Sequence, residues 1–271
     1  MRTNRVISRA QAAQLNLESR IELEMKLTDA EAERVKLQPV PTLQRFEQYR
    51  NRSPWRRAMF EFLGPLEDRI ILDVGCGYNP TPIYFALAGA RKVYACDVSP
   101  NAVNSVRQMA EITGVADRVN AFVSPAERLP LERESVDLIH GEAVLHHVQL
   151  RAAAAELARV LRKNGRAVFK DPLGQNPLLE FARDHLPYRW KKAAKGTDRP
   201  LKFAELACFR PHFRAYAYRG FGLASMLGLM VYGRGSDSKL RRAVDALDSF
   251  LLDTMPGLQR YCRFVVTCAH K

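Results

Sequence analysis

The sequence lacks the features of secreted, disulfide-bonded or membrane-spanning proteins. Its 271 residues include five cysteines and no Cys-x-x-Cys pair, which argues against a disulfide framework and a zinc knuckle. No apolar run approaches the roughly 18 residues of a spanning helix. The first twenty residues contain no apolar core of a secretory signal. We therefore expect a cytoplasmic protein without a transmembrane segment.

Acidic residues are scarce in one segment of the chain. The formal net charge is +13, and residues 183–219 hold ten Lys/Arg against three Asp/Glu, a local balance of +7. Such a field suits a nucleic acid, an anionic membrane surface or a phosphorylated substrate. The alternative is a solubilising surface with no ligand.

The length and the 47% hydrophobic content predict one large domain with an appended cap. Residues 1–66 are charge-rich and carry Leu17, Ile21 and Met25 at helical spacing. Pro39-Val40-Pro41 predicts a break between helices, and Leu63-Gly64-Pro65 predicts the end of the segment. We expect an N-terminal helical cap over residues 1–66 and a main domain over 67–271.

The main domain alternates between strand-like and helix-like segments every 20–30 residues or so, as stacked βαβ units do. This pattern predicts a doubly wound α/β fold, with a mostly parallel seven-stranded sheet, helices on both faces and a basic lid insertion over residues 175–211. Ser99-Pro100 is expected to start a helix and Asn164-Gly165 to stop one. The expected strands are 69–74, 92–97, 119–123, 136–140, 167–170, 213–218 and 263–268, and the expected helices include 82–88 and 152–161.

A glycine-rich loop follows the first strand directly, in Leu72-Asp73-Val74-Gly75-Cys76-Gly77-Tyr78-Asn79-Pro80. Glycine tolerates positive φ and has no Cβ, so Gly75 and Gly77 permit a tight turn under a ligand. Asp97 follows Gly77 by twenty residues, at the end of the second strand, where a carboxylate can accept hydrogen bonds from ribose hydroxyls. The pattern predicts a site for an adenosine-containing cofactor.

Two residues of this loop argue against a dinucleotide. The third glycine of a Gly-x-Gly-x-x-Gly fingerprint is replaced by Pro80. The carboxylate of Asp73, at the end of the first strand, would oppose a pyrophosphate and suits a ligand that carries an ammonium group.

These motifs resemble those of the class I S-adenosylmethionine-dependent methyltransferases, over about residues 69–171. Their acid-x-Gly-x-Gly-x-Gly motif is matched by Asp73, Gly75 and Gly77, with Asn79 in place of the last glycine. Asp97-Val98 is similar to the ribose-binding acid and its neighbour, and Ala126-Glu127 to the loop that packs on adenine. The resemblance implies S-adenosylmethionine as cofactor, bound by these eight residues: Asp73, Gly75, Gly77, Asn79, Asp97, Val98, Ala126 and Glu127.

Methyl transfer requires an aligned acceptor and, for some acceptors, a base. Ligands of open α/β sheets lie beyond the carboxyl ends of the strands, so the segment after the fourth strand should border the methyl group. It contains Glu142, His146 and His147, which we take as candidates for a general base or an orienting group. The alternative for either histidine is a packing or capping role. No further ligand set accompanies the His-His pair, so no metal site is expected.

The acceptor is indicated less directly. The Asn/Asp-Pro-Pro-Tyr/Phe motif of base-specific amino-methyltransferases is absent after the fourth strand, and Asp171–Pro177 resembles a stretch of bacterial methyltransferases thought to act on small molecules. We therefore expect a small-molecule acceptor, acidic or lipid-like. The alternatives are an RNA or protein methyltransferase that uses the basic surface, and a non-catalytic relative. The apolar stretch over Gly220–Gly235 is either a packed helix or a wall of the substrate pocket.

Overall fold

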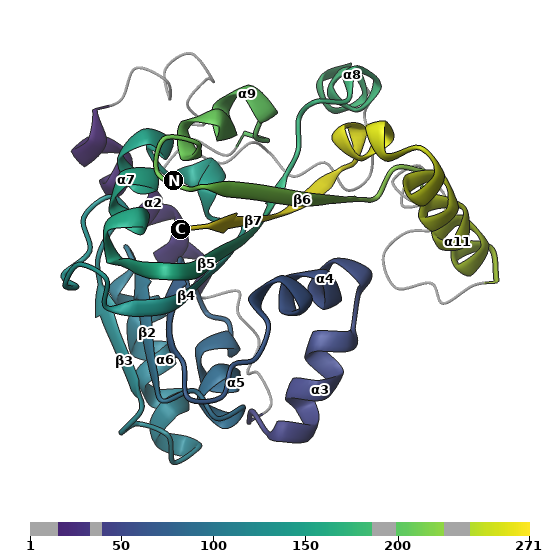
Figure 1. Ribbon diagram of the computed structural model, residues 1–271. Coiled ribbons are helices and arrows are strands. Elements are labelled where there is room, and N and C mark those ends of the chain that lie inside the picture. Colours follow the sequence, from purple (N-terminus) through teal and green to yellow (C-terminus); the bar gives the residue numbers. More distant parts are fainter. Residues whose placement is uncertain (1–15, 33–39, 186–198, 225–238) are drawn as a thin grey trace, which may run out of the picture.

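The centre of the computed structural model is a seven-stranded sheet with the order β3-β2-β1-β4-β5-β7-β6 (Figure 1). The structure describes residues 16–32, 40–185, 199–224 and 239–271. Strands β1 to β5 are parallel, and β7 is antiparallel to both β5 and β6. The doubly wound, mostly parallel sheet predicted from the sequence is confirmed. The strands are β1 Ile70–Val74, β2 Lys92–Asp97, β3 Val119–Val123, β4 Val136–Glu142, β5 Leu161–Pro172, β6 Ala215–Phe221 and β7 Phe264–His270.

Helices cover both faces of the sheet, and each face has its own apolar core (Figure 1). Helices α3 (Leu43–Asn51), α4 (Pro54–Leu63), α5 (Thr81–Leu87) and α6 (Pro100–Ile112) contribute to one core, and α7 (Leu150–Val160) and α9 (Phe203–Leu206) to the other. The remaining helices are α2 Leu17–Ala32, α8 Pro177–His185 and α11 Lys239–Thr254, with short 3₁₀ turns η1 Leu145–His147, η2 Ala207–Phe209 and η3 Pro256–Tyr261.

The two cores follow from the two-residue period of the strands. In β1, Ile71 faces the core that contains Met59 and Phe85, whereas its neighbour Leu72 faces the core that contains Leu157. All five of these apolar side chains are at most 1% exposed. The same alternation decides which side chains near the strand ends can meet one another in a site.

Local sequence signals set several helix boundaries. Ser99 is the N-cap of α6 and accepts from the amide of Ala102, with Pro100 at the first helical position, as predicted. Thr42 and Ser53 cap α3 and α4 in the same way. Such a cap contributes about 1 kcal/mol. Gly64, at φ 74°, ends α4, which confirms the predicted stop.

The end of α7 differs from the prediction. The helix stops at Val160, and β5 begins at the next residue, because Leu161 already pairs with Val136 of β4. Asn164 lies within β5 at φ 64°, and its amide donates to the carbonyl of Lys271 at 3.0 Å. Asn164-Gly165 therefore makes a turn inside the long strand and does not stop the helix.

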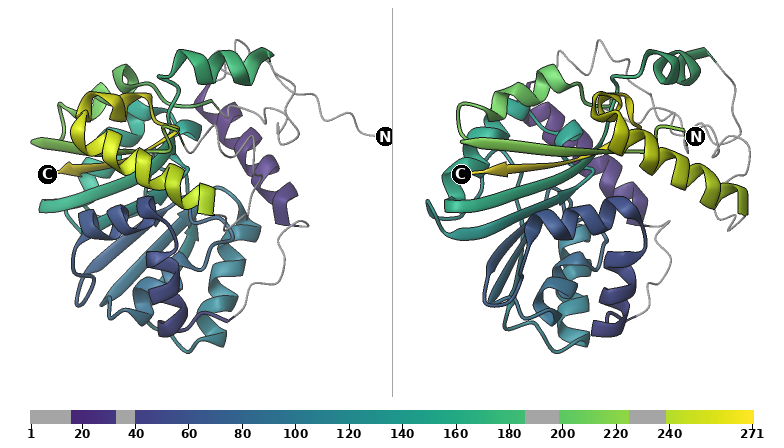
Figure 2. Two further views of the ribbon diagram at one scale, coloured as in Figure 1. Left: turned by 90° about the vertical axis from the view of Figure 1, so that its right-hand side faces the viewer. Right: turned by 45° about the vertical axis from the view of Figure 1, so that its right-hand side comes forward.

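Within the N-terminal segment, α2 is set apart from α3 and α4. Helix α4 packs on the sheet and α3 packs on α4 and α5, whereas α2 packs against α6 and lies outside the sheet layers (Figure 2). Residues 186–198 of the expected lid lie outside the described residues, as do residues 225–235 of the apolar stretch. In the described ranges, no helix has both the length and the apolarity that a membrane crossing requires.

Candidate functional site

The loop after β1 turns sharply beneath a cavity. The amides of Gly75 and Cys76 both donate to the carbonyl of Cys96 in β2, at 2.8 and 3.1 Å. Gly75 has φ 65° and Gly77 φ 51°, in the left-handed region that favours glycine. A Cβ on Gly75 would lie 2.7 Å from Cγ2 of Val144, so this position leaves no room for a side chain.

Asp97, at the end of β2, ties this loop to the next helix. Its Oδ2 accepts from the amide of Gly77 and its Oδ1 from the amide of Ser99, each at 2.9 Å. Burial raises the pKa of the Asp97 carboxyl, and the amides of Ser99 and Gly77 oppose that shift. Each carboxylate oxygen can accept a further hydrogen bond, so Asp97 can hold two neighbouring hydroxyl groups of a ligand in the cavity it lines.

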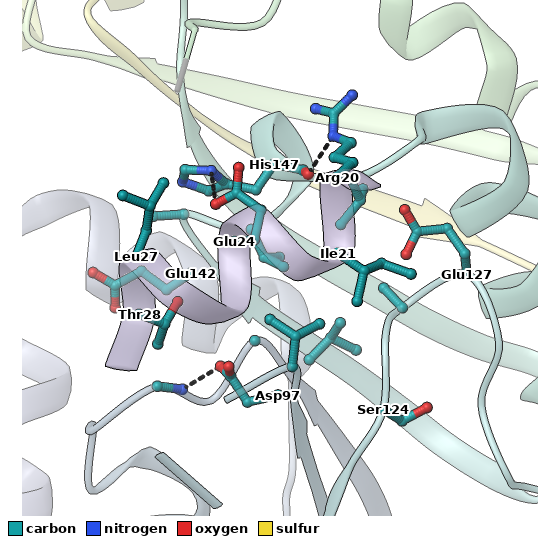
Figure 3. Close-up of a pocket in the computed structure, with 18 of the residues that line it drawn as sticks. Arg20, Ile21, Glu24, Leu27, Thr28, Asp97, Ser124, Glu127, Glu142 and His147 are labelled. Atoms are coloured by element: carbon teal, nitrogen blue, oxygen red, sulfur yellow. Dashed lines mark hydrogen bonds and ion pairs between the residues drawn. The ribbon is translucent and has the colours of Figure 1, made fainter. Parts of the chain in front are cut away.

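The cavity has a volume of about 300 Å³ and runs along the carboxyl ends of four neighbouring strands (Figure 3). Ser124, Ala126 and Glu127 follow β3, whereas Glu142 ends β4. Three strand spacings separate β3 from β4, which corresponds to about 14 Å. The cavity therefore suits an elongated ligand. Its lining also includes Val74, Gly75, Gly77, Asn79, Asp97, Val98, Ala143, Val144, His147 and Val148.

Helix α2 forms the opposite wall, which the sequence did not predict. In Figure 3 it crosses the cavity above Asp97. The Arg20 Nε donates to the carbonyl of His147 at 2.8 Å, and the Glu24 Oε2 lies 3.1 Å from the Nδ1 of His147. The helix also reaches α6, where Ser99 hydrogen-bonds to Asp29. The lining residues from α2 are Arg20, Ile21, Glu24, Leu27 and Thr28.

The Ile21→Ser/Leu27→Ser double variant tests this wall. We expect it to bind S-adenosylhomocysteine about tenfold more weakly, because it removes apolar surface that would cover the ligand. Isothermal titration calorimetry measures the affinity. The control variant, Glu22→Ser/Lys26→Ser, changes two α2 residues that are exposed and do not line the cavity. Equal affinities for both double variants would show that α2 does not contact the ligand.

Seven of the eight expected cofactor-binding residues line the cavity: Gly75, Gly77, Asn79, Asp97, Val98, Ala126 and Glu127. The structure places Asp73 elsewhere. Asp73 pairs in register with His140 of the neighbouring strand β4, and its Oδ1 lies 2.6 Å from the Nδ1 of His140. Asp73 is 2% exposed, and burial raises its pKa while His140 opposes the shift. Asp73 thus does not line the cavity, and its pairing with His140 joins the end of β1, where the loop begins, to β4.

Two of the three expected catalytic residues, Glu142 and His147, line the cavity. His146 does not: it is 6% exposed, and its Nδ1 lies 2.7 Å from Oδ1 of Asp171, at the end of β5. The ring centroids of His146 and His147 are 4.0 Å apart. In this structure His146 is therefore placed to support η1 and its neighbour, not to contact a ligand.

Glu142 is held by residues of the N-terminal helices. The Tyr49 hydroxyl of α3 donates to the Glu142 Oε2 at 3.4 Å, and an Arg56 terminal nitrogen of α4 lies 3.6 Å from its Oε1. Burial, with Glu142 beside it, raises the pKa of Tyr49 to about 12, so the phenol stays protonated as a donor near neutral pH. These partners could not be inferred from the sequence, because they lie more than 80 residues from Glu142 along the chain.

Glu127 borders the cavity on the side away from Glu142 (Figure 3). Its Oε1 accepts from the amide of Gln149 at 2.6 Å. Burial raises the pKa of its carboxyl, whereas the Gln149 amide and Arg20 lower it. Glu127 is thus fixed at the β3 end of the cavity, where a second carboxylate oxygen can accept from a ligand. In the part of the chain that the structure describes, no three His, Cys, Asp or Glu residues form a group suited to a metal ion.

Comparison with known proteins shows what the central segment of the chain is similar to. Residues 72–169 match the family model described as a methyltransferase domain. Ribosomal protein L11 methyltransferase of Acinetobacter baumannii is 32% identical over 100 residues, which are 37% of this chain and 33% of that protein. Sarcosine/dimethylglycine N-methyltransferase of Aphanothece halophytica is 33% identical over 104 residues, 38% of each chain. The chain thus spans only about a third of the length of these curated relatives.

Solved structures share the fold over more of the chain. Geranyl diphosphate C-methyltransferase from Streptomyces coelicolor A3(2), solved with S-adenosyl-L-homocysteine, has a TM-score of 0.61 at 16% identity, covering 93% of this chain and 97% of that one. The [4+2]-cyclase SpnF has a TM-score of 0.53 at 18% identity and covers 79% and 78%. The comparisons confirm the fold and the resemblance found in the sequence. A cyclase among them shows that this fold alone does not define the reaction.

Proposed function

We propose that this chain, in which residues 72–169 form a methyltransferase domain of the class I kind, transfers a methyl group from S-adenosylmethionine to a small-molecule acceptor that is acidic or amphiphilic. The observation that carries the proposal is the order of side chains along the cavity. Glu127, Asp97, the Gly75–Asn79 loop and Glu142 follow the sheet order β3-β2-β1-β4. That order matches the parts of the cofactor from adenine through ribose to the amino acid and the methyl group.

The residues present fit this cofactor. Asp97 has acceptor capacity for two ribose hydroxyls, and Gly75 and Gly77 allow the ligand to approach the backbone closely. Glu127 can accept from the adenine amino group. Because Asp73 is paired with His140, carbonyl groups of the Gly75–Asn79 loop would accept from the ammonium group of the cofactor. Adenosylmethionine supplies a methyl carbon that its sulfonium already activates, so the protein has mainly to align an acceptor and exclude water.

Glu142 and His147 are the side chains placed to act on the acceptor. Glu142 is 20% exposed, and with Tyr49 donating to one oxygen and Arg56 beside the other it retains acceptor capacity for an acceptor hydroxyl or amine proton. His147, next along the cavity wall, can take up a proton that the acceptor loses. Helix α2 covers both groups and limits the access of water.

The acceptor class can be tested with labelled methyl groups. The purified protein is incubated with methyl-labelled adenosylmethionine and, separately, with the small-molecule, protein and RNA fractions of a cell extract. We expect label in the small-molecule fraction, and its loss with Glu142→Gln, which keeps the shape but removes the charge. Transfer only to protein or RNA would favour the alternative acceptors. No transfer to any fraction, with intact cofactor binding, would favour a non-catalytic relative.

A further inference from the structure

A cluster of cations and aromatic rings lies beside Glu142, outside the cofactor cavity. Lys170 of β5 pairs in register with Glu142 of β4, so both side chains leave the same face of the sheet. Helix α4 packs over β5, and its first turn brings Trp55 and Arg56 to these strand ends. We define the cluster as Tyr49, Trp55, Arg56, Lys170 and Phe264.

Lys170 is unusual because its side chain is largely buried and its ammonium lies against aromatic rings. The residue is 8% exposed, and within the described ranges its ammonium makes neither an ion pair nor a hydrogen bond. Its Nζ instead lies 4.8 Å from the centroid of the Trp55 ring and 4.2 Å from that of Phe264. Burial lowers the pKa of Lys170, and Glu142 and Asp171 oppose that shift. A largely buried lysine that has no carboxylate within ion-pair distance is costly and is seldom retained without a function.

The surroundings of Arg56 independently indicate that this cluster suits an anion. Its guanidinium carbon lies 4.4 Å from the Tyr49 ring centroid and 4.3 Å from that of Trp55. Its Nε is buried and has no hydrogen-bond partner, and its contact with Glu142 is a long 3.6 Å. The charged groups that act on one another around Lys170 are three cations, Lys170, Arg56 and Arg263, and two carboxylates, Glu142 and Asp171. The positive charge is therefore in excess by one, which suits one further anion. A cationic acceptor would find the ring faces already taken by Arg56 and Lys170.

We propose that Lys170 and Arg56 bind an anionic group of the methyl acceptor, a carboxylate or a phosphate, while the edge of the partly exposed Trp55 ring contacts its apolar part. This inference rests on the proposed function, because Glu142 links the cluster to the cavity where the methyl group would lie. Arginine and lysine bind such anions through charge-assisted hydrogen bonds. The acceptor atom of the same molecule then faces Glu142, at the β4 end of the cofactor cavity.

The test uses the full chain saturated with S-adenosylhomocysteine. Benzoate, phenyl phosphate and benzyl alcohol serve as probes in calorimetric titrations at constant ionic strength. We expect at least one of the two anions to bind and the neutral alcohol not to bind. The relative affinity of benzoate and phenyl phosphate then distinguishes a carboxylate from a phosphate. Equal binding of all three probes, or binding of none, would overturn the inference.

Variants identify the residues. Lys170→Met and Arg56→Met are each expected to lower the affinity for the anionic probe by about tenfold or more. This is the typical effect of losing one charge-assisted hydrogen bond. The control is Arg57→Met, which changes the neighbouring arginine, exposed and outside the cluster. Affinity for S-adenosylhomocysteine should stay unchanged in Lys170→Met, and circular dichroism verifies folding. Intact anion binding by folded Lys170→Met and Arg56→Met would disprove the assignment. Failure of the unaltered chain to bind S-adenosylhomocysteine would instead count against the proposed function.

Discussion

Asp97→Asn is expected to weaken S-adenosylhomocysteine binding by about 100-fold or more, which corresponds to about 2.7 kcal/mol. The carboxylate already satisfies the amides of Gly77 and Ser99, and its remaining capacity is what the ribose would use. An amide of the same shape removes the charge and brings two donors to a site that needs acceptors. Hydrogen bonds to a charged group contribute about 1.5–3 kcal/mol each, so the loss of two accounts for this effect.

The control for this prediction is Asp117→Asn, an exposed carboxylate just before β3. It should leave the affinity unchanged. Because Asp97 also holds the loop, the unfolding transition of each variant is measured in parallel, so that loss of binding is separated from loss of fold. A folded Asp97→Asn protein with unaltered affinity would remove Asp97 from the site.

Gly75→Ala is expected to lower the free energy of unfolding by about 2–5 kcal/mol. The left-handed backbone at φ 65° costs about 1–2 kcal/mol for a residue with a Cβ, and the contact of 2.7 Å with Val144 adds about 1–3 kcal/mol of overpacking. Urea denaturation measures the change, with an unaltered slope indicating an unaltered unfolded state. The same variant should lose cofactor binding, because the loop must shift to accommodate the side chain of the introduced alanine.

Gly114→Ala separates the cost of the left-handed backbone from the cost of the contact with Val144. Gly114 also has a positive φ, 70°, but a Cβ there would meet nothing within 4 Å. The free energy of unfolding of Gly114→Ala should therefore fall only by the cost of the left-handed backbone, about 1–2 kcal/mol. The Val144→Ala change should recover part of the loss when combined with Gly75→Ala, as a double-mutant cycle measures. Equal destabilisation by Gly75→Ala and Gly114→Ala would show that the contact with Val144 has no energetic effect.

The sequence predicted the parts of this molecule that depend on local pattern. The strand at 92–97, the Ser99 cap and the succession of Gly75, Gly77 and Asp97 are short-range features, and all of them occur in the structure as predicted. Parallel strands of an α/β sheet are buried on both faces, so their apolar runs stand out clearly. The order of motifs along the chain then placed the cavity at the carboxyl ends of the strands.

Long-range contacts account for what the sequence missed. Helix α2 lines the cavity although nothing in its pattern distinguishes a cavity wall from a surface helix. Asp73 meets His140 because two adjacent strands place them side by side, 67 residues apart in the chain. The partners of Glu142 come from α3 and α4, which appeared in the sequence only as a charge-rich extension. Such contacts depend on tertiary packing, which periodicity does not encode.

The most direct test of the central claim is a crystal structure of the chain with S-adenosylhomocysteine. We expect the ligand between α2 and the strand ends, with its ribose hydroxyls on Asp97, its adenine beside Glu127 and its sulfur facing Glu142. That arrangement would place the reacting methyl group next to the cluster of Lys170 and Arg56. A ligand bound elsewhere, or one in the cavity with its sulfur directed toward Glu127, would contradict the proposed site and the chemistry assigned to Glu142.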